Sequence, residues 1–178
     1  MLPDTIETDR LILRAPRLSD AEPIFASYAQ DEEVTRYLMW SPHQSIEETK
    51  DFLEESIAVR DAGRGWPCVI TLAGSEDPVG MIDGRPDDGV VAVGYVLARR
   101  WWGQGHMTEA LAAFTNQVLS LPGIGVVRAT CDRANSGSVH VLEKCGYVES
   151  GTRQSKFPAF GDEPRACVVY ERRASSPS

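Results

Sequence analysis

Six residues near the middle of the chain, Arg100-Trp101-Trp102-Gly103-Gln104-Gly105, place an arginine and two closely spaced glycines directly before a helical pattern. Glycines allow the backbone to turn so that successive N–H groups point into one concavity. The first N–H groups of a helix add unpaired donors and the positive end of the helix dipole. Such a loop suits a diphosphate, with Arg99 or Arg100 adding charge. The alternative is a plain glycine turn before a helix, with both arginines solvated.

Two other phosphate-binding patterns do not fit the chain. A P-loop needs G-x-x-x-x-G-K-[ST], which is absent from the sequence. A dinucleotide-binding fingerprint needs G-x-G-x-x-G after the first strand of a βαβ unit. Thr108 stands where the third glycine would be, and several strand patterns precede the loop. The interpretation that remains is a loop that binds the diphosphate of another kind of ligand.

Strand and helix patterns alternate on both sides of this loop. Period-2 patterns and turn signals predict strands within residues 6–16, 65–74, 78–85, 89–98, 125–132, 147–154 and 165–173. Apolar periodicity predicts helices over 18–30, over 45–63, from the glycine loop through Val118, and over 138–145, with Gly146 as the stop. Ser19 with Glu22, and Ser45 with Glu48, have capping-box spacing. The order predicts a single α/β (α+β) domain over 1–173, with a disordered tail at 174–178.

Composition limits the possible partners. The formal net charge is −8, from 26 acidic and 18 basic residues, which disfavours nucleic acid and is compatible with a cationic partner such as an amine. No apolar run reaches the roughly 18 residues of a membrane span, and no secretory signal opens the chain, so we expect a cytoplasmic protein without membrane contact. The four cysteines and three histidines are scattered, which predicts reduced thiols and no metal site.

Three separated motifs resemble the GNAT acetyltransferase superfamily. Its acetyl-coenzyme A loop reads [RQ]-x-x-G-x-[GA] between a fourth strand and a third helix, as here. The segment "WGQGHMTEA" is similar to "WGKGYATEA" of the branch that contains ribosomal-protein N-terminal acetyltransferases. "NSGSVHVLEKCGY", from Asn135 to Tyr147, matches that branch's Asn-x-x-Ser segment and "VLEKxGF", and "ETDRLILR" is a typical opening. The resemblance covers nearly the whole chain. It implies a mixed, mostly antiparallel sheet of about seven strands, splayed between strands 4 and 5 and flanked by about four helices.

The resemblance also assigns the residues that bind acetyl-coenzyme A. Backbone N–H groups of the loop would hold the diphosphate, namely those of Gly103, Gln104, Gly105, His106, Met107 and Thr108. Val96 and Leu97 would form main-chain hydrogen bonds with the pantetheine arm. A backbone N–H on the same strand would polarise the thioester carbonyl as an oxyanion donor.

Two residues before the last helix receive roles near the thioester. Asn135 is expected to cap that helix, and by resemblance it also contacts the pantetheine arm. Ser138 aligns with a serine that lies near the thioester sulfur and donates a proton to the leaving thiolate. The alternative is an ordinary first-turn serine. Other branches carry a tyrosine four residues later, where this chain has Leu142, so Ser138 or water is the expected donor.

The general base is less clearly marked. An alkylammonium with a pKa of about 10 is only about a thousandth deprotonated at neutral pH, so exposing its lone pair costs about 4 kcal/mol. Family members often place a glutamate where this chain has Ala92. Asp83 on the preceding strand is the nearest replacement, and Glu33 or a water chain are the alternatives. Trp40, between the first two predicted helices, is expected at the acceptor groove.

The sequence thus predicts an acetyl-coenzyme A dependent N-acetyltransferase in which an amine attacks the thioester directly. No Cys or Ser shows the base partnership that an acyl-enzyme requires. The acceptor is a protein N-terminus or a small amine, and the protein could form a homodimer. The rival functions are a non-catalytic acyl-coenzyme A binding module, favoured by Ala92, and transfer of a larger acyl group.

Overall fold

One eight-stranded sheet organises the chain in the computed structural model, which describes residues 2–174. The spatial order is β1-β2-β3-β4-β5-β6-β8-β7, and every neighbouring pair is antiparallel except β5 and β6. The strands are β1 Thr5–Glu7, β2 Leu11–Arg14, β3 Cys68–Leu72, β4 Pro78–Asp87, β5 Val90–Leu97, β6 Val126–Asp132, β7 Val148–Ser155 and β8 Arg165–Arg173. The predicted tail lies outside the described residues beyond position 174.

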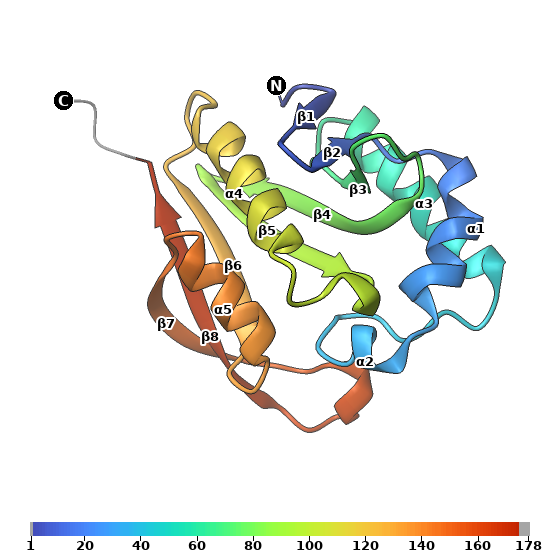
Figure 1. The fold of residues 1–178 in the computed structure, drawn as a ribbon. Coiled ribbons are helices and arrows are strands. Elements are labelled where there is room, and N and C mark those ends of the chain that lie inside the picture. Colours follow the sequence, from blue (N-terminus) through green and yellow to red (C-terminus); the bar gives the residue numbers. More distant parts are fainter. Residues whose placement is uncertain (1, 175–178) are drawn as a thin grey trace.

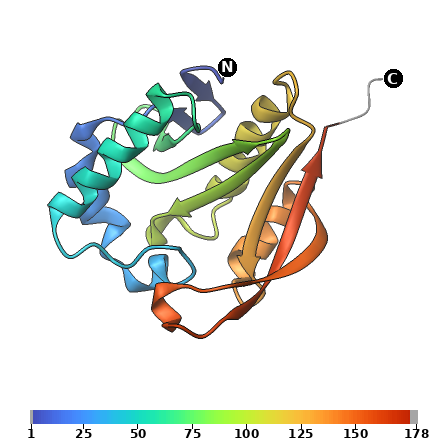
Figure 2. The same ribbon diagram turned by 180° about the vertical axis from the view of Figure 1, so that it is seen from behind.

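Helices cover both faces of the sheet (Figures 1 and 2). Helices α4 and α5 lie on one face, and α1 and α3 lie on the other. The helices are α1 Ala21–Ile24, α2 Glu32–Thr35, α3 Ile46–Asp61, α4 His106–Leu119 and α5 Ser136–Lys144. The predicted apolar stripe of α4 is buried in the larger of two cores. The smaller core lies under α1 and α3 and includes Met81 and Val96 from the sheet.

The predicted fold class is confirmed, but the chain has one strand and one helix more than expected. The first predicted strand is divided, because the backbone turns at Thr8, whose N–H donates to Leu11 O at 2.9 Å. The extra helix, α2, forms because the Asp31 side chain caps it by accepting from the N–H groups of Glu33 and Val34. With the first strand divided, the fourth and fifth predicted strands become β5 and β6.

Neither predicted capping box forms its hydrogen bonds, although Ser45 is the N-cap of α3 as predicted. Residues 18–29 are a run of 3-10 helix, α1 and π-helix, and the carboxylate that fixes its start is Asp20. Asp20 accepts from the Arg17 N–H at 2.8 Å, while the Arg14 guanidinium binds it at 2.7 and 2.9 Å. At α3, Glu48 accepts from the N–H of Gln44, one residue before the predicted cap. Carboxylates still satisfy these helix starts, but from shifted positions.

The parallel pair β5 and β6 separates soon after it begins. Only Val90, Val91 and Ala92 pair with β6, opposite residues 126–128. Beyond Ala92 the two strands diverge, as both ribbon views show (Figures 1 and 2). This divergence, called the splay below, leaves the β5 edge from residue 93 to 97 unpaired with β6. It is the opening that the resemblance predicts between the fourth and fifth strands.

Candidate functional site

The glycine loop leads from the open end of β5 to the first turn of α4. Gly103 and Gly105 have φ values of +71° and +79°, a backbone conformation that other residues rarely adopt. No side chain caps α4, and within residues 2–174 the N–H groups from Gly103 to Thr108 have no backbone acceptor. A Cβ built on Gly103 would meet nothing within 4 Å. Free donors, open space and the helix dipole together suit an anionic group at this loop.

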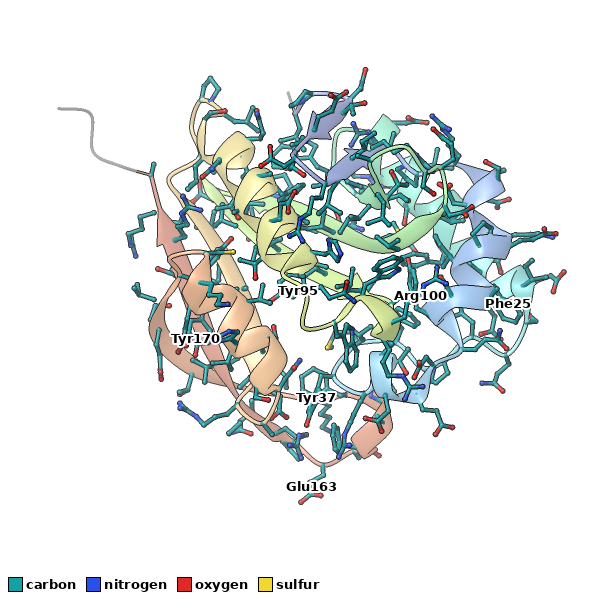
Figure 3. All side chains as sticks on the ribbon, viewed as in Figure 1. Phe25, Tyr37, Tyr95, Arg100, Glu163 and Tyr170 are labelled. Carbon is teal, nitrogen blue, oxygen red and sulfur yellow. The ribbon has the colours of Figure 1, made fainter. Side chains whose placement is uncertain are left out.

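The arginines around the loop are placed differently from one another. Arg99, two residues after β5, pairs with Asp31 at 3.0 Å and so links the start of the loop to the N-cap of α2. Arg100 is exposed in the 3-10 turn that follows β5 (Figure 3), and its guanidinium lies over the Trp101 ring, 5.4 Å from the ring centroid. Arg10, which the sequence did not point to, reaches the loop from the turn before β2 and donates to Gln104 O at 3.0 Å. Arg10 is held there by Glu109 on α4 at 2.6 Å.

The side chains of the loop's second half pack inward. His106 is buried and meets the edge of Trp101 at 5.5 Å, and burial lowers the pKa of its imidazole. Met107 lies in the larger core. The indole of Trp102 donates to Leu97 O at 2.7 Å, so that carbonyl is already occupied. Loop residues therefore face a ligand chiefly through their main chain.

Asn135 and Ser138 stand at the α5 side of the splay. Asn135 caps α5, as predicted, by accepting from the Ser138 N–H at 3.2 Å. The Ser138 hydroxyl lies 2.6 Å from the hydroxyl of Tyr95 on β5. Leu142 is fully buried. Tyr95 is the functional candidate that the sequence reading missed, because no local pattern marks a contact between residues 43 positions apart.

Asp83 faces the opposite side of the sheet from α4. It pairs with Gly94 in the register of β4 and β5, while Ala92, the usual carboxylate position, pairs with Arg85. Arg85 binds one Asp83 oxygen, and the other oxygen, Oδ1, is buried and has no hydrogen-bond partner among residues 2–174. Burial raises the pKa of Asp83, although Arg85 and nearby backbone N–H groups oppose the shift. A carboxylate with a raised pKa and a free oxygen fits a general base.

The two acceptor-side residues of the sequence prediction are not brought together. Glu33 is 56% exposed, lies 3.8 Å from Arg36, and lines a cavity of about 520 Å³ with residues 25–28, 30–32 and Arg99. Trp40 is not part of that lining, and it packs against His43 and Phe52. A second cavity, of about 510 Å³, is lined by residues 132–134 and 163–166 at the far end of β6. Asp83 and Ser138 line neither cavity.

Across residues 2–174 no cluster of three or more His, Cys, Asp or Glu side chains could hold a metal ion. No helix in the same range has the length and apolarity needed to cross a membrane. All four cysteines are free and buried.

Known proteins share this architecture. The family model described as acetyltransferase (GNAT) domain matches residues 10–148. The chain belongs to the GNAT acetyltransferase family. A relative called uncharacterized N-acetyltransferase p20, from Bacillus licheniformis, is 25% identical over 163 residues, which cover 89% of this chain and 90% of the relative. As a GNAT acetyltransferase, the protein is an enzyme of the N-acetyltransferase class.

Solved GNAT structures extend the fold similarity over nearly the whole chain. RimL, a ribosomal L7/L12 alpha-N-protein acetyltransferase solved with coenzyme A, has a TM-score of 0.85 at 19% identity, covering 97% of this chain and 99% of RimL. MccE, a microcin C7 self-immunity acetyltransferase solved with acetyl-coenzyme A and AMP, has a TM-score of 0.85 at 18% identity, covering 93% of each chain. These similarities show that the GNAT fold is shared.

Proposed function

We propose that this GNAT enzyme transfers an acetyl group from acetyl-coenzyme A to a primary amine by direct attack, without an acyl-enzyme. The observation that carries the proposal is the continuous path from the splay to the glycine loop. Along it, the β5 edge is unpaired beyond Ala92, and the loop N–H groups are free. The loop would bind the diphosphate of coenzyme A, and the unpaired edge near Val96 would run beside the pantetheine arm.

The proposed chemistry uses the two catalytic candidates, Asp83 and Ser138. The amine would lose a proton to Asp83, and its nitrogen would form a bond to the thioester carbon. A backbone N–H on the open β5 edge would stabilise the oxyanion of the tetrahedral intermediate. As the C–S bond breaks, the Ser138 hydroxyl would donate a hydrogen bond to the leaving sulfur, the second nitrogen proton would pass through this hydroxyl to give the coenzyme A thiol, and Asp83 would return its proton to solvent. Most of the rate enhancement would come from positioning the reactants and from the oxyanion contact.

For the acceptor, we propose a protein N-terminus or a small primary amine. The name of RimL, a protein N-terminal acetyltransferase, supports the first class. The net charge of −8 supports cationic acceptors in either class. The amine would approach from the Asp83 face of the sheet, opposite α4. A screen of peptides with free N-termini, polyamines and amino acids, read as thiol release from acetyl-coenzyme A, would identify the acceptor.

The first test is a calorimetric titration of the protein with acetyl-coenzyme A. Gly103→Val is expected to weaken binding at least a hundredfold, because valine resists the positive φ and its side chain would fill the open space at the loop. Gly74→Val is the matched control, since Gly74 has φ +82° and equally open surroundings in the turn after β3.

Micromolar binding by the parent and the control, but not by Gly103→Val, supports the cofactor assignment. No binding by the parent contradicts it, and a loss in both variants contradicts the role of the loop. Competition by succinyl-coenzyme A and other thioesters then tests acyl preference. Tighter binding of a longer acyl group would contradict acetyl as the natural group.

A further inference from the structure

A tyrosine and a serine form a hydrogen bond across the splay. Tyr95 lies on β5 three residues past the last pair with β6, and Ser138 lies in the first turn of α5. Their hydroxyl oxygens are 2.6 Å apart, and the Tyr95 hydroxyl is also 3.4 Å from Ser138 O. Figure 3 shows Tyr95 between β5 and α5, on the side of the sheet that carries α4. The pair therefore joins the two elements between which the thioester would lie.

The surroundings keep the Tyr95 hydroxyl neutral and hold the backbone of Ser138 in place. Burial raises the pKa of Tyr95 far above its usual range, so its hydroxyl keeps its hydrogen at neutral pH. Burial also raises the pKa of the neighbouring Cys131 thiol to about 11, so no thiolate competes for that hydrogen. Asn135 holds the Ser138 N–H and fixes the serine backbone. Since the Tyr95 hydroxyl can donate to Ser138 Oγ, the serine hydrogen is left for another acceptor, and the sulfur of neighbouring Cys131 is one.

We propose that Tyr95 is a positioning residue for acetyl transfer: its hydroxyl donates to Ser138 Oγ and turns the serine hydrogen toward the sulfur of the leaving thiolate. This inference rests on the proposed function, in which Ser138 assists the departure of coenzyme A. Tyr95 does not give up its own proton, and it acts only through Ser138. Other branches place a tyrosine on the last helix, where this chain has Leu142. In this chain the tyrosine hydroxyl near the serine comes from Tyr95 on β5 instead.

The test uses acetyl-coenzyme A with hydroxylamine as the acceptor. Hydroxylamine is unprotonated at neutral pH, so its attack needs no general base, and the assay isolates the departure of the thiol. Release of coenzyme A thiol gives kcat and KM for the parent, Tyr95→Phe, Ser138→Ala and the double variant. Calorimetry with coenzyme A measures binding separately, and thermal unfolding monitors the fold.

Tyr147→Phe is the matched control. The Tyr147 hydroxyl bonds to the Thr115 hydroxyl at 2.7 Å, so it makes the same kind of contact between a tyrosine and a helix hydroxyl, but inside the core. The similar branch has phenylalanine at this position in its "VLEKxGF" motif, so the chain should tolerate the change. This variant is expected to keep kcat within about twofold of the parent.

Tyr95→Phe is expected to lower kcat roughly fivefold to tenfold, the effect of one hydrogen bond, while KM and the affinity for coenzyme A stay within about twofold. Ser138→Ala is expected to lower kcat roughly a hundredfold. In the Ser138→Ala background, adding Tyr95→Phe should change kcat by less than about twofold, because the residue through which it acts is gone.

Three results would overturn the inference while leaving the proposed function intact. The first is an unchanged kcat in Tyr95→Phe, and the second is a decrease in kcat in Tyr147→Phe equal to that in Tyr95→Phe. The third is a double variant whose decrease in kcat is the product of the decreases in Tyr95→Phe and Ser138→Ala. A parent protein that binds no acetyl-coenzyme A overturns the proposed function itself, and calorimetry shows this before any variant is made.

Discussion

The two sides of the splay are built in different ways. On the side of α4 and α5, the groups offered to a ligand are mostly main chain: free N–H groups in the loop from Gly103 to Thr108 and the unpaired edge of β5. On the opposite side, the candidates are side chains that already have partners. Asp83 is bound by Arg85, Glu33 lies beside Arg36, and Trp40 packs on Phe52.

This difference separates what the fold fixes from what it leaves variable. A main-chain site depends on glycine conformations and strand pairing, so it persists wherever the fold persists. A side-chain site can be replaced one residue at a time without disturbing the sheet. Under the proposed function, the cofactor would therefore be tied to the GNAT fold, whereas the acceptor would depend on side chains such as Asp83, which can be replaced without changing the fold.

The largest expected effect on the acceptor side is that of Asp83→Asn. If Asp83 removes the proton from the amine, turnover with an alkylamine should fall roughly a hundredfold or more at neutral pH. Turnover with hydroxylamine should fall less than about threefold, because that nucleophile needs no base. Asp87→Asn, at the end of the same strand, is the control and should leave both rates within about twofold.

The pH dependence of kcat/KM gives a second test of Asp83 as the general base. Burial raises the pKa of Asp83, and a general base acts only when ionised. Hence kcat/KM for an alkylamine should rise with pH through a pKa above the ordinary range of a carboxylic acid, and this limb should vanish in Asp83→Asn. A profile that keeps this limb in the variant would assign the base to another group or to water.

A smaller effect is expected on stability, at the end of β6 that diverges from β5. Side-chain contacts hold this end of the strand in place. Buried Asp132 at the end of β6 is bound by Arg165 of β8 and accepts from the Ala134 N–H at 2.8 Å. Asp132→Asn should lower the free energy of unfolding at pH 7 by about 2 kcal/mol, the range for a hydrogen bond to a charged group. Asp162→Asn, whose fully exposed carboxylate is 3.7 Å from Lys156, should leave the free energy of unfolding unchanged within experimental error.

The difference between these two variants should depend on pH. Burial alone would raise the pKa of Asp132, but Arg165 and the Ala134 N–H lower it overall. A depressed pKa means that the stabilisation is fully present above the pKa of the unfolded carboxyl and is lost as pH falls through the folded pKa. Denaturant unfolding should show that the gap between the free energies of unfolding of Asp132→Asn and Asp162→Asn is smaller at acidic pH than at neutral pH. A constant gap would mean that the carboxylate charge does not carry the stabilisation.

The elements that the sequence predicted correctly are those encoded by short local patterns. The stripe of α4, the glycine stop after α5 and the Asn135 cap each depend on a few neighbouring residues. The two capping boxes were predicted with the wrong hydrogen bonds because several carboxylates stand close together in the chain, and three-dimensional contacts select among them. At α1, the buried Arg14 selects Asp20 over the predicted pair.

Site contacts between distant residues were not predictable in the same way. Tyr95 meets Ser138 across 43 positions, and Arg10 meets Glu109 across 99. The alternation of β5 placed Tyr95 on the same face as buried Val91 and Val93, which reads as packing. The hydrogen bond between Tyr95 and Ser138 depends on the register of the strands and on the position of α5, which the local sequence does not show. Arg99 shows the converse, since its sequence position suggested a ligand contact and its side chain instead pairs with Asp31.

The smallest expected effect most directly tests the contrast between main chain and side chain. Arg100 is exposed and stacks on Trp101, and at physiological salt its charge is screened within about 8 Å. Arg100→Ala should therefore weaken acetyl-coenzyme A binding less than about threefold, with little change between low and moderate salt in calorimetry. A loss comparable to that of Gly103→Val would mean that the diphosphate is held mainly by a side chain. In that case single side-chain substitutions could change the proposed cofactor site as readily as the acceptor site. The main-chain conformation of the glycine loop would then not be sufficient to explain cofactor binding.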